Sequence, residues 1–142
     1  MKKLILLFII AGFLTQAQAQ KMMAKDVPGA VTAVFYKAHP TIKDVDWKRD
    51  GSNYEAEYDK GKLDKSVTYD ASGKLLETEV EILASELPSS VMEYVKKTYK
   101  ENEVKEASKI TDANGTVTYE AEVKGKDLIF DSKGNFIKAI KD

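Results

Sequence analysis

The stretch Tyr54-Glu55-Ala56-Glu57-Tyr58 places a carboxylate at every second position, and the chain nearly repeats it as Tyr119-Glu120-Ala121-Glu122-Val123. A period of two is typical of a strand that buries one face and leaves the other in water. Each copy is preceded by a segment with helical spacing of apolar residues and followed by an Asp-x-x-Gly turn. The sequence therefore predicts a duplicated unit that consists of one helix and several strands.

The first nineteen residues have the composition of a signal peptide. Lys2 and Lys3 precede an apolar run from Leu4 to Leu14, and Ala17-Gln18-Ala19 fits a cleavage site. The apolar run is shorter than the roughly 20 residues that span a bilayer, although a membrane anchor is the competing interpretation. We expect an exported protein, periplasmic or secreted, that begins at Gln20 and leaves the membrane after cleavage.

Composition excludes several classes of function. The chain has no cysteine and one histidine, so a Cys–His catalytic pair and a thiolate or multi-histidine metal site are not possible. Its 22 basic and 23 acidic residues are well mixed, without the basic stripe that nucleic-acid binding requires. We therefore expect no enzyme, no catalytic residue, no metal and no cofactor. His39 is interpreted as a structural residue at the end of a helix.

In the first half, Gln20 to Lys25 is predicted to be a short, poorly ordered leader. A helix is then expected from a cap at Asp26, with Pro28 in its first turn, to His39, because the following Pro40 disfavours helical geometry there. Four strands are expected after the helix, joined by turns at 50–51, 60–62 and 70–73. Their central residues are Val45 to Trp47, Tyr54 to Tyr58, Val67 to Tyr69, and Leu75 to Ile82.

The second half repeats this plan. A helix is expected after a cap at Ser85 or Glu86, with Pro88 in its first turn. The strands that follow are expected at 104–110, 119–123, 128–130 and 136–140, with turns at Asn114-Gly115, at Gly125 and at 131–134.

This order of elements predicts an α+β fold. Two tandem helix-plus-four-strand units are expected to form a largely antiparallel sheet with the helices on one face. The predicted organisation is a signal peptide at 1–19, a first repeat at 20–83 and a second repeat at 84–142.

Four features stand in a distinctive order along the chain. They are the helix starts Val27-Pro28 and Leu87-Pro88, Trp47 before Asp50-Gly51, the two Tyr-Glu-Ala-Glu strands, and the turn Asp70-Ala71-Ser72-Gly73. In these features the chain resembles the PepSY-like family of small exported proteins, over nearly the whole mature length. The fold of that family resembles the β-lactamase-inhibitor protein, in which two helix-and-four-strand units share one antiparallel sheet. The resemblance implies a periplasmic binding or inhibitory module and brings no catalytic motif.

The carboxylates of the alternating strands are the candidate functional residues. Pairs of this kind can act as the acid and base of a glycosidase, but these alternate on a face that is expected to be wet, with lysines nearby. We expect helices to cover the other face, so this face is predicted to be open and to bind a protein partner. The alternative is that the acidic rows only keep an exposed sheet face soluble. Its residues are Glu55, Glu57, Glu77, Glu79, Glu120 and Glu122.

Aromatic residues are mostly expected in the core. By alternation, the inner positions are Trp47, Tyr54, Tyr58, Tyr69, Tyr119 and Phe130. Tyr36, Leu75 and Ile129 fall on outer positions, where exposed apolar side chains can contribute to a protein contact.

Two functions are compatible with these patterns. The first is a non-catalytic periplasmic binding module, an inhibitor or regulator of another exported protein. The alternative is a carrier that holds a small apolar ligand in a cleft between helices and sheet. An enzyme is a distant third. The sequence leaves the partner, the ligand and the oligomeric state open.

Overall fold

The computed structural model describes residues 19–100 and 103–141, which form two compact units. One unit runs to Leu76 and the other begins at Glu77. All of the predicted signal peptide except Ala19 lies outside the described residues. Within the described ranges, no helix is long and apolar enough to cross a membrane.

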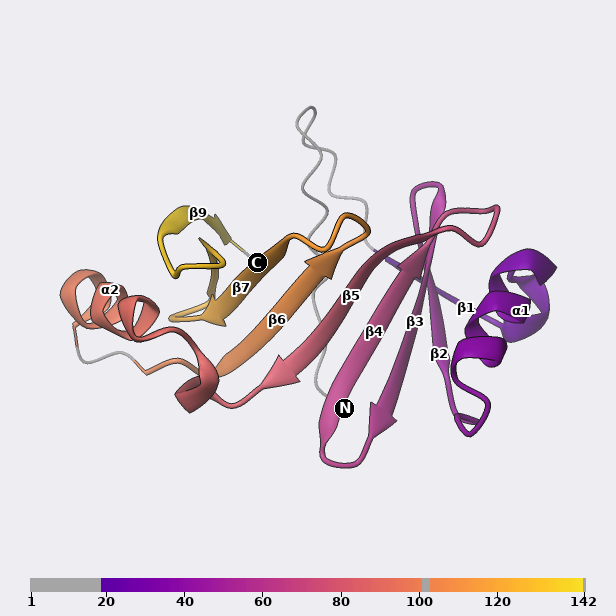
Figure 1. Cartoon of the computed structure of the whole chain (residues 1–142), viewed down its shortest axis with the longest axis horizontal. Coiled ribbons are helices and arrows are strands. Elements are labelled where there is room, and N and C mark those ends of the chain that lie inside the picture. Colours follow the sequence, from indigo (N-terminus) through magenta and orange to yellow (C-terminus); the bar gives the residue numbers. More distant parts are fainter. Residues whose placement is uncertain (1–18, 101–102, 142) are drawn as a thin grey trace. The chain divides into compact units, whose positions relative to one another are not determined.

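The first unit contains four antiparallel strands, one α-helix and one short 3-10 helix (Figure 1). The strands lie in chain order, each beside the next. The elements are β1 Gln20–Met22, η1 Ala24–Asp26, α1 Gly29–Ala38, β2 Asp46–Asp50, β3 Asn53–Lys60 and β4 Leu63–Tyr69. The prediction of a poorly ordered leader at 20–25 was wrong, because β1 pairs with β2 from Gln20 opposite Arg49 to Met22 opposite Trp47.

The second unit repeats this architecture with one helix and antiparallel strands in chain order. Strand β5 begins before the unit boundary, and its pairing with β6 starts at Glu77. The elements are β5 Leu75–Ile82, η2 Ala84–Glu86, α2 Ser89–Tyr99, β6 Glu106–Asp112, β7 Val117–Glu122, β8 Lys126–Asp131 and β9 Phe136–Lys141. The α+β class and the two helix-and-strand repeats are confirmed.

Both helices begin later than the sequence predicted. Pro28 and Pro88 are the N-cap residues, and neither helix has a side-chain hydrogen bond at its cap. Asp26 instead ends η1, while the Glu86 carboxylate accepts a hydrogen bond of 2.8 Å from the Leu83 N–H. The predicted caps fail because each acidic residue ends a 3-10 turn, and an extended residue, Val27 in the first unit, follows it before the helix-capping proline.

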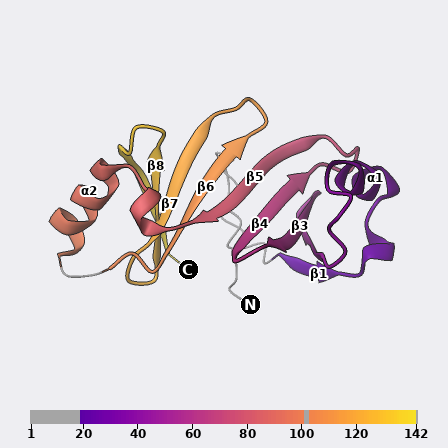
Figure 2. The ribbon, with the colours of Figure 1, turned by 60° about the horizontal axis from the view of Figure 1, so that its bottom comes forward.

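Each helix packs on one face of its own strands, which we call the inner face (Figure 2). In the first unit, Phe35 lies edge-on to Trp47 and Tyr58, with ring centroids 5.3 and 5.4 Å apart. Trp47 is 1% exposed, which confirms its assignment to the core, and the other predicted inner aromatics are buried or partly buried. The core of the second unit consists largely of aliphatic residues, among them Val91, Val95 and Leu128.

Three turns with the pattern Asp-x-x-Gly share one geometry. In each, the Asp Oδ1 accepts hydrogen bonds from the backbone N–H two and four residues later. The Gly adopts a positive φ and donates its N–H to the Asp carbonyl. The turns begin at Asp70, Asp112 and Asp131. These bonds stabilise the ionised carboxylate and lower the pKa of each Asp, which fits the predicted hairpin turns.

Candidate binding face

The six predicted carboxylates lie on the strand face opposite the helices, which we call the outer face. In the first unit, Glu55 lies between Lys48 and Thr68 across the neighbouring strands. Glu57, two positions on, points the same way, while the intervening Ala56 is part of the inner core. The alternation that the sequence predicted for this strand is therefore present.

In the second unit the same alternation brings carboxylates from four strands together. Glu79 lies opposite Ile110, and Glu120 lies between Ser108 and Ile129. The inner positions of the same strands, such as Ala107 and Ala121, belong to the helix-covered core. The other predicted carboxylates of this unit have acidic neighbours. Glu77 is opposite Asp112, and Glu122 is opposite both Glu106 and Asp127.

The outer face is less wet than the sequence predicted. Glu55 and Glu79 are each 1% exposed and Glu120 is 8% exposed, while Glu57, Glu77 and Glu122 are half-buried. The expectation of solvated carboxylates is thus wrong for the first three. Glu55 and Glu120 both sit on interior strands, so side chains of two paired strands crowd them from either side.

Apolar residues are also embedded in the outer face of the second unit. Ile110 is 5% exposed and Ile129 is fully buried, although neither belongs to the cluster beneath α2. Ile129 had been expected to be exposed, and that expectation was wrong. The continuous run Leu128-Ile129-Phe130, buried throughout, was the signal for a strand that is buried on both faces. Tyr36 and Leu75, by contrast, are exposed as predicted.

Burial changes the acidity of Glu55 in the first unit. The loss of water raises its pKa to about 7, and the negative charge of Glu57 acts in the same direction. Lys48 opposes the shift, but its ammonium is engaged in an ion pair with Glu57.

Glu77 has a similar environment in the second unit. Burial raises its pKa to about 7, and the charge of Asp112 on the facing strand contributes to the shift. Asp112 stays ionised readily, because its turn bonds lower its own pKa. Glu77 therefore faces a lasting negative charge at neutral pH.

Acidic residues dominate the outer face of both units. In the second unit, the only basic residue on the outer face is Lys138, among the paired residues of the described strands. The acidic residues there are Glu77, Glu79, Glu81, Glu106, Asp112, Glu120, Glu122, Asp127 and Asp131. The outer face of the first unit carries two bases, Lys21 and Lys48. Its acidic residues are Asp46, Asp50, Glu55, Glu57, Asp59 and Asp64.

The carboxylate rows of the outer face can attract positively charged groups.

Among residues 19–100 and 103–141, no group of three or more potential metal ligands comes together. His39 lies on the inner side, where its ring is 4.8 Å from Phe35 and its Nδ1 is 3.5 Å from the Tyr58 hydroxyl. It follows Ala38 at the end of α1, as predicted for a structural histidine.

A family model described as "Putative beta-lactamase-inhibitor-like, PepSY-like" matches the chain twice, at residues 13–77 and 52–138. Together the two matches span both helix-and-strand repeats. No curated protein matches the chain.

Several solved structures share the fold. A protein of Bacteroides eggerthii, described as "putative periplasmic", is 16% identical with a TM-score of 0.73 over 80% of this chain and 88% of its own. A DUF2874 family protein of Bacteroides uniformis is 21% identical with a TM-score of 0.70 over the same shares. A BLIP-like protein of Bacteroides fragilis is 24% identical, with a TM-score of 0.60 over 80% of this chain and 85% of that one.

Proposed function

The chain belongs to the PepSY-like family, and from that membership we propose that it is a non-catalytic exported module that binds another protein through its outer face. Inhibition or regulation of that partner is the role that the β-lactamase-inhibitor-like description of the family suggests. Export to the periplasm is supported by the signal-peptide composition of the first nineteen residues and by the description of the B. eggerthii structure.

One observation carries the proposal: like charges lie directly opposite each other on the outer face. Glu122 faces Glu106 on β6 and Asp127 on β8, and Glu77 faces Asp112. Facing like charges destabilise a sheet. A face that only has to stay soluble can avoid this repulsion by interspersing acidic and basic residues. These facing carboxylates support a binding role, in which a basic partner reduces the repulsion between them.

The chemistry of the face defines the partner. A basic protein surface would be attracted from a distance and oriented by the acidic rows, which raises the association rate and the specificity more than the affinity.

The alternative of a ligand carrier has less support. In the first unit Phe35 contacts both Trp47 and Tyr58, and in the second Tyr94 lies 5.5 Å from Phe130, so side chains of the helix meet those of the sheet directly. Such packing favours a rigid module, which loses little conformational entropy when it binds.

Affinity capture from a periplasmic extract, with a matched pair of charge variants, tests the proposal. Glu77→Lys/Glu122→Lys reverses two half-buried outer-face charges that have acidic neighbours. Glu93→Lys/Glu103→Lys makes the same change in net charge at exposed positions outside the face. We expect a basic protein to be retained by the wild type and the second variant and to be lost by the first, with binding that weakens as salt rises.

Unfolding midpoints of both variants would be measured alongside, to separate binding from stability. Equal capture by all three proteins would exclude the outer face as the binding surface. Failure of the wild type to retain any protein under low-salt conditions would refute the binding role itself.

A further inference from the structure

Strand β9 is an open edge of the second unit. Among the described residues it pairs with β8 alone, from Lys126 opposite Lys141 to Phe130 opposite Phe136. Alternate residues of an edge strand direct their backbone N–H and C=O groups away from the sheet, where they can pair with a further strand. Residues of β9 are exposed on both of its faces, so an incoming strand could reach these groups.

The internal repeat shows what fits beside such a strand. β5 follows the turn at 70–73 as β9 follows the turn at 131–134, so the two strands hold equivalent places in their repeats. Beside β5 lies β6, which pairs with it antiparallel from Glu77 to Ile82. The equivalent place beside β9 holds no strand of residues 19–100 or 103–141.

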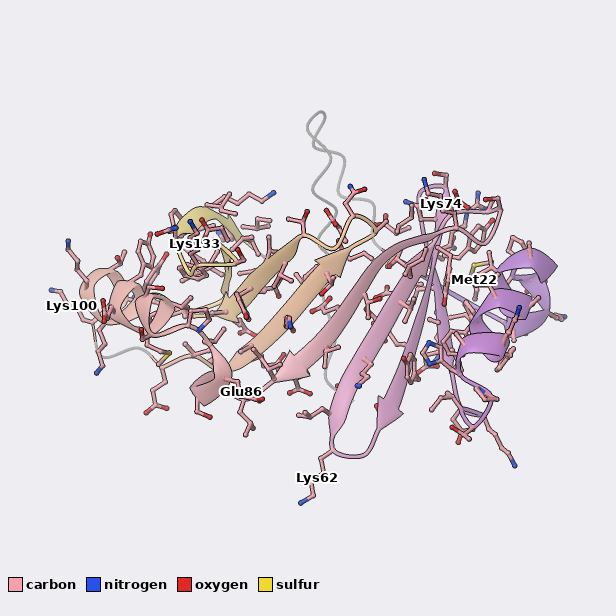
Figure 3. The ribbon with its side chains drawn as sticks, viewed as in Figure 1. Met22, Lys62, Lys74, Glu86, Lys100 and Lys133 are labelled. Atoms are coloured by element: carbon pink, nitrogen blue, oxygen red, sulfur yellow. The ribbon has the colours of Figure 1, made fainter. Side chains whose placement is uncertain are left out.

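Strand β9 is basic, whereas β5, the equivalent strand of the first repeat, is acidic. β5 carries three glutamates on its outer face, whereas β9 carries Lys138 there and Lys141 on the other side. Lys141 lies directly opposite Lys126, and Lys133 extends from the preceding turn (Figure 3). Strand β9 therefore carries positive charge, whereas β5 carries negative charge.

Apolar groups adjoin these lysines. Phe136 stacks on Tyr94 of α2 with ring centroids 4.6 Å apart and an interplanar angle of 9°, and it remains 38% exposed. Ile137 is 50% exposed. A strand beside β9 would thus meet exposed apolar side chains at one end and lysines at the other.

We propose that β9 is a docking edge for an extended acidic segment of another protein, which pairs with β9 as β6 pairs with β5. Backbone hydrogen bonds hold the segment, and its acidic residues at alternate positions share one face, where they lie beside Lys138 on the outer face of β9. A second copy of this chain is a poor occupant, because β9 against β9 brings lysines together. This edge is a separate surface from the outer face, so the two binding roles can be tested independently.

The test uses a capped synthetic peptide with the sequence of Leu75–Ile82, which alternates glutamate with other residues and forms a strand in this fold. We expect saturable binding to the full chain by calorimetry. Lys138→Glu/Lys141→Glu should weaken binding by about tenfold. It should also allow binding of a peptide in which lysine replaces the three glutamates. Lys37→Glu/Lys43→Glu, an equal charge change at exposed positions of the first unit, should bind the acidic peptide as the wild type does.

Backbone pairing is tested separately from charge. N-methylation of the peptide at alternate residues blocks one of its edges, and methylation at the other residues blocks the opposite edge. We expect one pattern to abolish binding and the other to preserve it. No binding at millimolar peptide, equal binding by the Lys138→Glu/Lys141→Glu variant, or equal effects of both methylation patterns would overturn the proposal. A dimer in sedimentation that Lys138→Glu/Lys141→Glu alters would assign the edge to a second copy instead.

Discussion

Reversing the charge of Glu122 should stabilise the protein, although most substitutions in a folded chain do the opposite. Glu122 lies on β7 between Glu106 of β6 and Asp127 of β8, so it is directly opposite two acidic residues. A facing pair of charges contributes roughly 0.2–1 kcal/mol, with the sign set by whether the charges are alike. Glu122→Lys converts two repulsive pairs into two attractive ones. Because each of the two pairs changes sign, we expect the free energy of unfolding to rise by about 0.8–4 kcal/mol.

Urea denaturation followed by circular dichroism measures this effect. The transition midpoint should move to higher urea while its slope stays constant, which identifies a change in stability rather than in the compactness of either state. Glu122→Gln, which removes the repulsion without adding attraction, should give about half of the gain. Glu93→Lys on the exposed side of α2 controls for the change in net charge and should have little effect.

A Glu122→Lys protein as stable as the wild type, or less stable, would refute this reasoning, because it would mean that the facing carboxylates do not repel one another appreciably. The expected result has a functional counterpart. A substitution that stabilises the free protein while it removes partner binding identifies a charge that is kept for binding at the expense of stability.

Three further predictions concern acidity, the core and a turn. Glu77→Gln should leave stability unchanged at pH 4.5 and raise it by roughly 1–3 kcal/mol at pH 8. The pKa of Glu77 is raised from 4.5 to about 7 in the folded state, so the wild type loses stability as pH rises through that window. If the free energies of unfolding of the two proteins changed with pH in parallel, this prediction would be wrong. Trp47→Ala should cost about 3–5 kcal/mol in chemical denaturation, with Trp47→Phe far milder, and an unchanged midpoint would place the indole outside the core. Gly134→Ala should cost about 1–3 kcal/mol more than Gly115→Ala in thermal unfolding, because both glycines have positive φ but only an added Cβ at Gly134 meets Ser90 and Pro88; equal losses would exclude that contact.

Local patterns were sufficient to predict most of the fold. Alternation of polar and apolar residues identified β3 and β5, and the Asp-x-x-Gly pattern located the turns that join the strands. The repeat of these signals gave the two units without any tertiary information. Strand β1 was missed because three residues cannot display a period, and this strand exists through its pairing with β2.

The candidate face could be predicted only in part. Alternation states which way a side chain points, and it placed Glu55 and Glu120 on the correct face. It does not state how closely the neighbouring strands surround that side chain, so the burial of both residues was not foreseen. The facing charges at Glu122 depend on the register between strands, which follows from hairpin lengths and bulges rather than from any single segment.

The order of the strands has a consequence for the speed of folding. In each unit every strand pairs with the one that follows it, and the helix directly precedes the hairpins that it covers. The hairpins that join β2 to β4 and β6 to β9 bring together residues close in sequence, whereas β1–β2 and β5–β6 pair across a helix. Little loop entropy is lost when the hairpins form, and contacts of low sequence separation are associated with fast folding. A chain that is synthesised from its N-terminus could thus complete most of one helix-and-sheet unit before the residues of the next have been added.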